Sequence, residues 1–325
     1  MPAATPSSAP AVVCAGIIVA DHLCTPIDHI PAAGELVPAD ELVLNIGGCA
    51  TNAAMNLTRL GVHATVCGKV GDDVFGRFVA QTLTDAGVDV GGIRIDPDRA
   101  TSQSLIINVR GQDRRFIHAV SASKGFVAAD IDAALAAGMP KVLYVGGYLI
   151  LPGLDPAALA DRFAKVRASG GWTMLDVVTT GPGNHLDLLR PVLPQTDLFL
   201  PNTDEAAIIL GEHDPVRQAL AFRAMGARRV VITCGDKGSV VASEGFNARV
   251  GAYPVNFVDG SGGGDAFDSG YIAGLVDGLP ELECLKLASA VGASCVRAVG
   301  TTAGVFNRAE ADAFIAQHSL SVETF

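Results

Sequence analysis

The chain alternates short, almost continuous apolar runs with segments in which apolar residues recur every three or four positions. The apolar runs predict strands at 11–20, 63–70, 141–150, 171–178, 197–202 and 228–235. The segments between them predict helices over 50–60, 73–86, 130–137, 155–169, 203–211 and 214–226. Buried strands that alternate with helices are typical of a parallel sheet covered on both sides. We therefore predict an α/β fold with a doubly wound, mostly parallel sheet, in which ligands bind at the carboxyl ends of the strands.

Two stretches do not follow this alternation. Residues 22–46 are extended and rich in turn-forming residues, and 101–120 predict two strands joined by a polar turn at about 111–114. We expect them to form a small β-sheet lid, with the arginines of its turn exposed. These arginines are Arg110, Arg114 and Arg115. The main α/β domain would then comprise 11–21, 47–100 and 121–325, after a disordered tail at 1–10.

Composition narrows the function classes. Of the 325 residues, 49% are hydrophobic and 18% are charged, which is typical of a globular protein. The net charge of −11, with no dense Lys/Arg run, argues against binding to nucleic acid or to an anionic membrane. The seven scattered cysteines have no CxxC spacing, and the first apolar run, too short to span a bilayer, follows no basic segment. We therefore expect reduced thiols and a cytoplasmic location.

The segment with the clearest candidate chemistry is "DGSGGGDAF", residues 259–267. It lacks the Lys-Ser/Thr of a Walker loop, and Asp265 replaces the third glycine of a dinucleotide-binding pattern. The sequence after it predicts a helix, so Gly262, Gly263 and Gly264 would form its first turn. Their amides could stabilise a transferring phosphoryl group, and Asp265 could deprotonate the attacking hydroxyl. The alternative is a turn in which the aspartate only caps the helix.

This segment resembles the second signature of the PfkB/ribokinase family of carbohydrate and nucleoside kinases, usually D-T-x-G-A-G-D-x-F. The resemblance extends from about residue 12 to 316, and the family's other motifs follow in the same order. They are "GGCATNAAMNLTRLG" (47–61), "GKVGDDVFG" (68–76), "NTDE" (202–205) and "TCGDKGS" (233–239). The match implies a ribokinase-like fold, an ATP-dependent kinase and a set of site residues.

The resemblance implies that sugar hydroxyls are bound by Asp21, Gly47, Gly48 and Asn52. It implies that Asn202 and Glu205 organise phosphates bound to magnesium (Mg²⁺), and that Thr233, Gly235 and Gly238 lie along ATP. Without the family match, Asn202 and Glu205 could simply cap a helix, and "TCGDKGS" could be a β-turn. An activating potassium ion (K⁺) is implied at Asp259, Ser261 and Gly300.

The sequence also departs from the family pattern. Gly260 and Gly263 replace the usual Thr and Ala of the signature. The Asn and Arg that many sugar kinases carry after the strand ending near 176 are missing, and 121–125 read "SASKG" where Gly-Ala-Asn is frequent. The two glycines should leave the anion hole workable in a more flexible loop. The other two departures leave Asp265 in place, but they concern the residues that select the substrate.

We therefore predict an ATP-dependent kinase that phosphorylates a hydroxyl of a small sugar such as ribose or fructose. Asp265 would be the general base and the amides of 262–264 the anion hole. A nucleoside kinase is the first alternative. It is less favoured because a nucleobase usually stacks on aromatic residues, and Phe116 is the only one in the predicted lid. A non-catalytic sugar-binding regulator is the second, against which the presence of Asp265 argues. The lid would exclude water, and it could pair between subunits in a homodimer.

Overall fold

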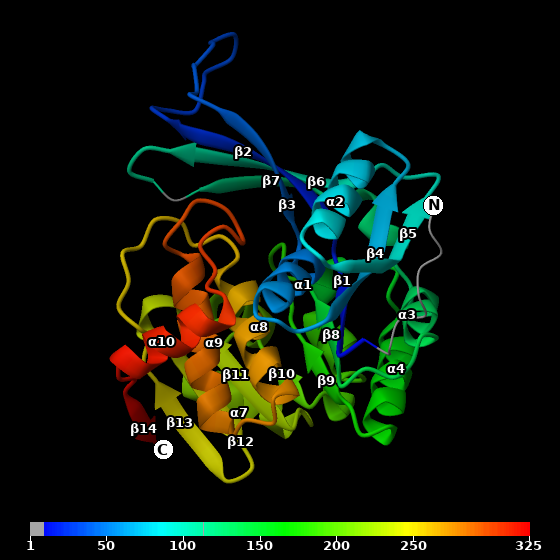
Figure 1. The fold of residues 1–325 in the computed structure, drawn as a ribbon, viewed down its shortest axis with the longest axis vertical. Helices are drawn as coiled ribbons and strands as arrows, with labels where there is room; N and C mark the ends of the chain where they lie inside the picture. Colours follow the sequence, from blue (N-terminus) through cyan, green and yellow to red (C-terminus); the bar gives the residue numbers. More distant parts are fainter. Residues whose placement is uncertain (1–9, 113) are drawn as a thin grey trace.

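One large sheet forms the centre of the molecule (Figure 1). The computed structural model describes residues 10–112 and 114–325, so residues 1–9 of the expected tail lie outside the described residues. The ten strands lie in the order β14-β13-β12-β11-β10-β9-β8-β1-β4-β5, parallel from β5 to β11 and antiparallel beyond. This confirms the predicted mostly parallel sheet. The strands are β1 (Val12–Gly16), β4 (Ala64–Gly71), β5 (Asp89–Asp96), β8 (Val142–Gly146), β9 (Trp172–Leu175), β10 (Leu198–Phe199), β11 (Arg229–Thr233), β12 (Ser239–Ser243), β13 (Phe246–Val250) and β14 (Val322–Thr324).

Helices cover both faces of this sheet, because its strands are apolar on both sides. In β1, Val12 and Cys14 belong to one buried core, whereas Val13 and Ala15 belong to the other. The first core is completed by α1 (Cys49–Arg59), α2 (Val74–Asp85), α8 (Gly263–Val276), α9 (Glu281–Cys295) and α10 (Arg308–Gln317). The second is completed by α3 (Ala128–Leu135), α4 (Pro156–Ala168), α5 (His185–Leu189), α6 (Thr203–Leu210) and α7 (Pro215–Ala224).

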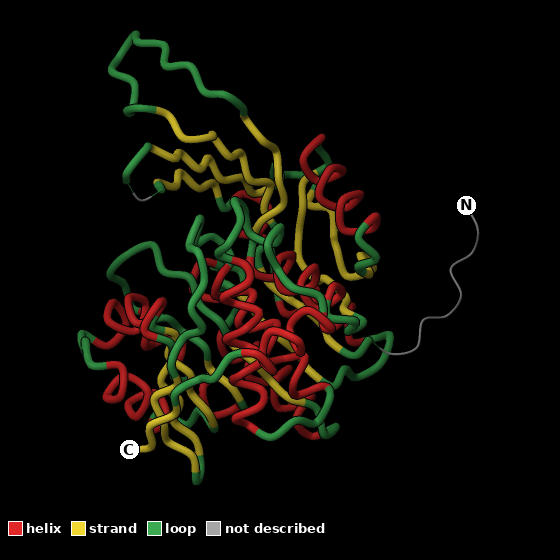
Figure 2. Tube along the Cα trace, turned by 60° about the vertical axis from the view of Figure 1, so that its left-hand side comes forward, coloured by secondary structure: helices red, strands yellow, loops and turns green. Residues whose placement is uncertain are grey.

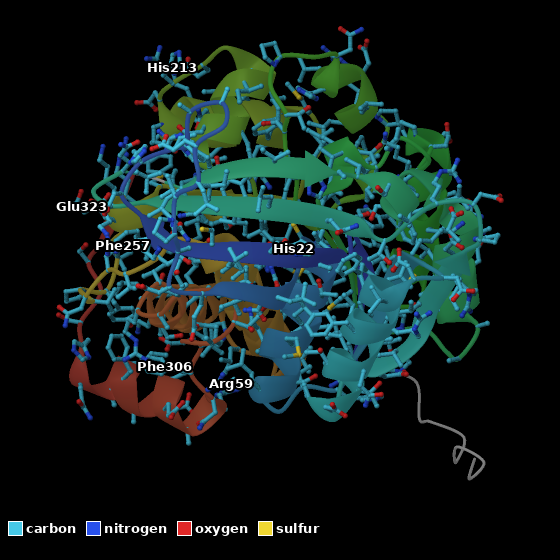
Figure 3. All side chains as sticks on the ribbon, turned by 90° about the horizontal axis from the view of Figure 1, so that it is seen from above. His22, Arg59, His213, Phe257, Phe306 and Glu323 are labelled. Atoms are coloured by element: carbon cyan, nitrogen blue, oxygen red, sulfur yellow. The ribbon has the colours of Figure 1, made fainter. Side chains whose placement is uncertain are left out.

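A second, four-stranded sheet stands over the body, and the 28–41 connection extends beyond it (Figures 1 and 2). Its order is β3 (Leu42–Gly47), β2 (Val19–Ile27), β6 (Ser102–Val109) and β7 (Arg115–Ala119). Figure 3 looks onto the face turned away from the body, where His22 is labelled on β2. Strands β6 and β7 lie within 101–120, whereas β2 begins three residues before the stretch 22–46 and β3 ends one residue after it.

The apolar run at 11–20 predicts one strand, but the structure divides it between the two sheets. β1 ends at Gly16, whose φ is 140°. A Cβ there would lie 2.2 Å from the carbonyl oxygen of Gly146, so only glycine can make this turn. The chain then enters the second sheet at Val19, and Asp21 lies within β2 instead of at the end of a strand of the main sheet. Among the described residues, no helix is long and apolar enough to cross a membrane.

Candidate active site

Asp265 lies in the first turn of α8 and follows a turn at Gly262 that has no room for a side chain. Gly262 caps the helix with φ 72°, and a Cβ on it would lie 2.3 Å from the carbonyl oxygen of Thr301. The amide of Gly263 donates to the carbonyl of Gly260 at 3.3 Å. A Cβ on Gly264 would meet no atom within 4 Å, so the helix begins in open space. An exposed helix N-terminus of this kind stabilises an anion.

Asn52 connects this turn to α1. Its Nδ2 donates to Oδ2 of Asp265 at 2.8 Å, although the two residues are 213 positions apart. The Asn52 Oδ1 atom is buried and has no hydrogen-bond partner in the described part of the chain. Because a buried polar atom without a partner is costly, this oxygen can accept a hydrogen bond from a ligand hydroxyl beside the Asp265 carboxylate.

Asp21 approaches the same place from the second sheet. The first glycine of α1's "GG" turn, Gly47, makes room for it, since a Cβ on Gly47 would lie 1.9 Å from Oδ2 of Asp21. Gly48 is the N-cap of α1 with φ 94°, which favours glycine. Burial raises the pKa of Asp21 to about 6, Ser104 lowers it through a hydrogen bond, and the charge of Asp265 raises it further. The structure thus brings together all four residues expected to bind hydroxyls, around Asp265.

Further carboxylates lie behind Asp265, and the sequence analysis did not identify them. Asp268 is 2% exposed and accepts a hydrogen bond from the Tyr144 hydroxyl at 3.1 Å. Burial, followed by the charge of Asp265, raises the pKa of Asp268, and burial and neighbouring carboxylates also raise that of Asp176. Desolvation raises the pKa of Asp265 too, and hydrogen bonds from Asn52 and Cys49 oppose this. Asp176 directly follows a buried strand, a position that could have signalled a site residue.

Asn202 and Glu205 form a capping box at the start of α6. The Asn202 side chain accepts from the amides of Asp204 and Glu205, and Oε2 of Glu205 accepts from the amide of Asn202 at 3.0 Å. This is the capping arrangement that the sequence left open. Glu205 also faces the site: burial raises its pKa to about 7, the Asn202 amide opposes this, and the charge of Asp265 adds to the increase.

Thr233 lies beside this cap, where β11 ends. Its amide donates to the carbonyl of Pro201 at 3.1 Å, and it pairs with Asn202 in an isolated parallel bridge. Gly235 and Gly238 form the following turn with φ 60° and 86°. A Cβ on Gly238 would lie 2.0 Å from the carbonyl oxygen of Val250. The two motifs expected to bind ATP are therefore neighbours at the carboxyl ends of β10 and β11.

The loop that precedes the glycine turn is held by Asp259. Its Oδ1 accepts from the amide of Ser261 and its Oδ2 from the amide of Gly300, each at 2.9 Å. Nη1 of Arg114 lies 3.4 Å from Oδ1, and the Arg114 side chain is only 23% exposed. The expectation that this arginine sits in an exposed turn is therefore wrong for Arg114. It is turned inward because the partly buried Asp259 carboxylate attracts it.

The chain is similar to known proteins over most of its length. The family model described as pfkB family carbohydrate kinase matches residues 9–307. A fructokinase from Klebsiella pneumoniae is 30% identical over 283 residues, covering 84% of this chain and 91% of that protein. A cytidine kinase from Thermococcus kodakarensis is 27% identical over 269 residues, covering 80% of this chain and 91% of that protein.

The fold is also found in solved structures. A putative ribokinase II from E. coli, in complex with ATP and Mg²⁺, superposes with a TM-score of 0.78 at 25% identity, covering 95% of this chain and all of that chain. The fold and the site define an ATP-dependent phosphotransferase with an alcohol group as acceptor. The chain belongs to the pfkB family of carbohydrate kinases.

Proposed function

We propose that the protein transfers the γ-phosphoryl group of ATP to a hydroxyl of a small sugar, with Asp265 as the general base. The observation that carries this proposal is the Asn52–Asp265 hydrogen bond of 2.8 Å beside the N-terminus of α8. Through this bond the carboxylate lies next to an amide oxygen that has no hydrogen-bond partner among the described residues, and both are close to a helix N-terminus, which favours anions. These are the groups that a hydroxyl acceptor and a phosphoryl donor require together.

In this mechanism Asp265 accepts the hydroxyl proton as the oxygen attacks. The amides of Gly262, Gly263 and Gly264 are assigned to the charge that develops on the transferred group, as an anion hole. Asp21, Gly47, Gly48 and Asn52 orient the acceptor, and positioning of this kind accounts for much of the rate in phosphoryl transfer. The raised pKa of Asp265 makes it a stronger base than an exposed aspartate.

ATP is assigned to the region at the carboxyl ends of β10 and β11, which contains Asn202, Glu205, Thr233, Gly235 and Gly238. Mg²⁺ suits this region, because burial and then the charges of neighbouring carboxylates raise the pKa of Asp176, Glu205 and Asp268. A divalent cation would compensate these charges. Glu205 would hold the ion, directly or through water, and the ion would supply charge neutralisation on the phosphates.

The four-stranded sheet of β2, β3, β6 and β7 is proposed to act as the lid over the acceptor. In register across the sheet lie Asn45, Asp21, Ser104 and His118, so one row of the lid faces the sugar with polar groups. This polar row favours a sugar. Phe116, 55% exposed two positions along β7, offers the surface for a nucleobase, so a nucleoside is the second candidate acceptor.

Replacement of Asp265 by Asn tests the proposal. ADP release is measured over a panel of sugars and nucleosides, with fructose, ribose and cytidine as first members. The variant should lose about 10²–10⁴-fold in kcat with any acceptor that the parent uses. Asp187→Asn, in an exposed part of α5, is the matched control. A loss of less than about tenfold at Asp265 would exclude the general-base role.

Two further assignments concern the protein as a whole. The outer face of the lid exposes a row of apolar side chains at Leu44, Leu105 and Ile117, with Leu42 further along, which supports a homodimer formed through the lid. All seven cysteines are free thiols, which supports a reducing, cytoplasmic location. The partners are then ATP, the acceptor and a second copy of the chain, and the acidic net charge of −11 opposes nucleic acid as a partner.

A further inference from the structure

The lid arginine Arg114 reaches the loop that forms the anion hole. Its Nη1 lies 3.4 Å from Oδ1 of Asp259, whose side chain is 11% exposed. The guanidinium carbon lies 5.4 Å from the ring centroid of Phe116, so the aromatic face helps to hold the charge in place. A positive charge carried by the lid therefore rests on the first residue of the "DGSGGGDAF" segment.

The family resemblance implies K⁺ at Asp259, Ser261 and Gly300, and the residues present there do not fit that ion. The Asp259 carboxylate already accepts the amides of Ser261 and Gly300 and faces the Arg114 guanidinium. The carbonyls of Ser261 and Thr301 accept from the Cys295 thiol at 3.3 and 3.2 Å. A monovalent cation would have to compete with a guanidinium for a carboxylate whose two oxygens are both engaged.

The unusual Gly260 accounts for how the arginine fits. A Cβ on Gly260 would lie 3.0 Å from Nη1 and 3.4 Å from Nη2 of Arg114. The threonine that is usual at this position would therefore require the guanidinium to shift by a few tenths of an ångström. Glycine at 260 and arginine at 114 are complementary, although 146 positions separate them in the sequence. The departure from the family signature thus lies beside the Arg114 guanidinium.

We propose that the Arg114 guanidinium replaces the activating monovalent cation, so that this enzyme carries the cation on its lid and does not require K⁺. The inference rests on the proposed kinase function and deepens it. Arg114 acts through Asp259, which fixes the amides of Ser261 and Gly300 on either side of the anion hole, so it is a positioning residue. Closure of the lid and completion of the anion hole become one event.

The first test needs no substrate and therefore stands even if the acceptor is never identified. Thermal unfolding of the full chain is followed in KCl and in choline chloride at equal ionic strength. The wild type should show no K⁺-specific rise in Tm. Arg114→Ala should gain one, because it removes the guanidinium from the Asp259 carboxylate. Arg110→Ala is the matched control, since Arg110 directly follows β6 and pairs with exposed Asp28.

The second test uses whichever acceptor the panel identifies. In choline chloride, Arg114→Ala should lower kcat by on the order of tenfold, as expected for loss of a charge-assisted contact, with a smaller change in KM. KCl should restore most of this loss, and Arg114→Lys should retain more activity than the alanine variant. A wild-type enzyme that requires K⁺, or an Arg114→Ala variant whose K⁺ response equals that of the wild type, overturns the proposal. Activity in the panel with either result leaves the kinase function itself intact.

Discussion

Replacement of Asp21 by Asn should stabilise the protein while it weakens substrate binding. Asp21 is 5% exposed, and burial raises its pKa from 3.8 to about 6. At neutral pH the native state therefore holds a desolvated carboxylate that the unfolded chain would hydrate. A difference of roughly 2 pH units corresponds to about 3 kcal/mol at 1.36 kcal/mol per unit. Asparagine has nearly the same shape and carries no charge, so it should remove this cost.

The pH dependence follows from the sign of the shift. Because the native pKa is raised, the native state binds the proton more tightly, and the wild type loses stability as pH rises from about 4 to about 6. The advantage of Asp21→Asn should therefore be near zero at pH 4 and reach about 3 kcal/mol above pH 6. Urea unfolding followed by the fluorescence of the single tryptophan, Trp172, measures it at each pH.

Asp28→Asn serves as the control, because Asp28 directly follows the strand that carries Asp21 and its side chain is 81% exposed. It should leave the stability unchanged within about 0.5 kcal/mol at every pH. The KM of Asp21→Asn for its sugar should rise by at least about tenfold, since one charged hydrogen-bond acceptor is lost. An Asp21→Asn protein that is less stable than the wild type at pH 7, or whose gain does not vary with pH, would refute the reasoning.

Two other predictions use the same structure. Gly262→Ala should destabilise the protein by about 1–3 kcal/mol and lower kcat, because φ 72° is unfavourable for alanine and its Cβ would lie 2.3 Å from the carbonyl oxygen of Thr301. Urea unfolding measures the stability, and the ADP assay measures kcat. A variant unchanged in both would contradict the assigned turn. Leu105→Lys combined with Ile117→Lys should produce monomers with an intact fold, measured by light scattering, and a wild type that is already monomeric would exclude the homodimer.

The sequence alone determined the fold class and the family, and physical reasons explain this. A strand buried on both faces and a helix buried on one leave different periodic patterns, so the parallel sheet of β1, β4, β8, β9 and β11 was predictable from short windows. The same holds for turns that only glycine can make, such as those at Gly48 and Gly262. Motifs of this kind are local, and their order along the chain identifies the family.

Only the tertiary structure decided which residues from distant parts of the sequence come into contact. The hydrogen bond between Asn52 and Asp265 and the approach of Arg114 to Asp259 depend on how α1, α8 and the second sheet pack. The strand predicted at 11–20 would place Asp21 directly after a strand of the main sheet. Asp21 lies in the second sheet instead, because the apolar residues on both sides of Gly16 look alike in sequence. Periodicity records whether a side chain is buried, and it carries no information about which distant residue buries it.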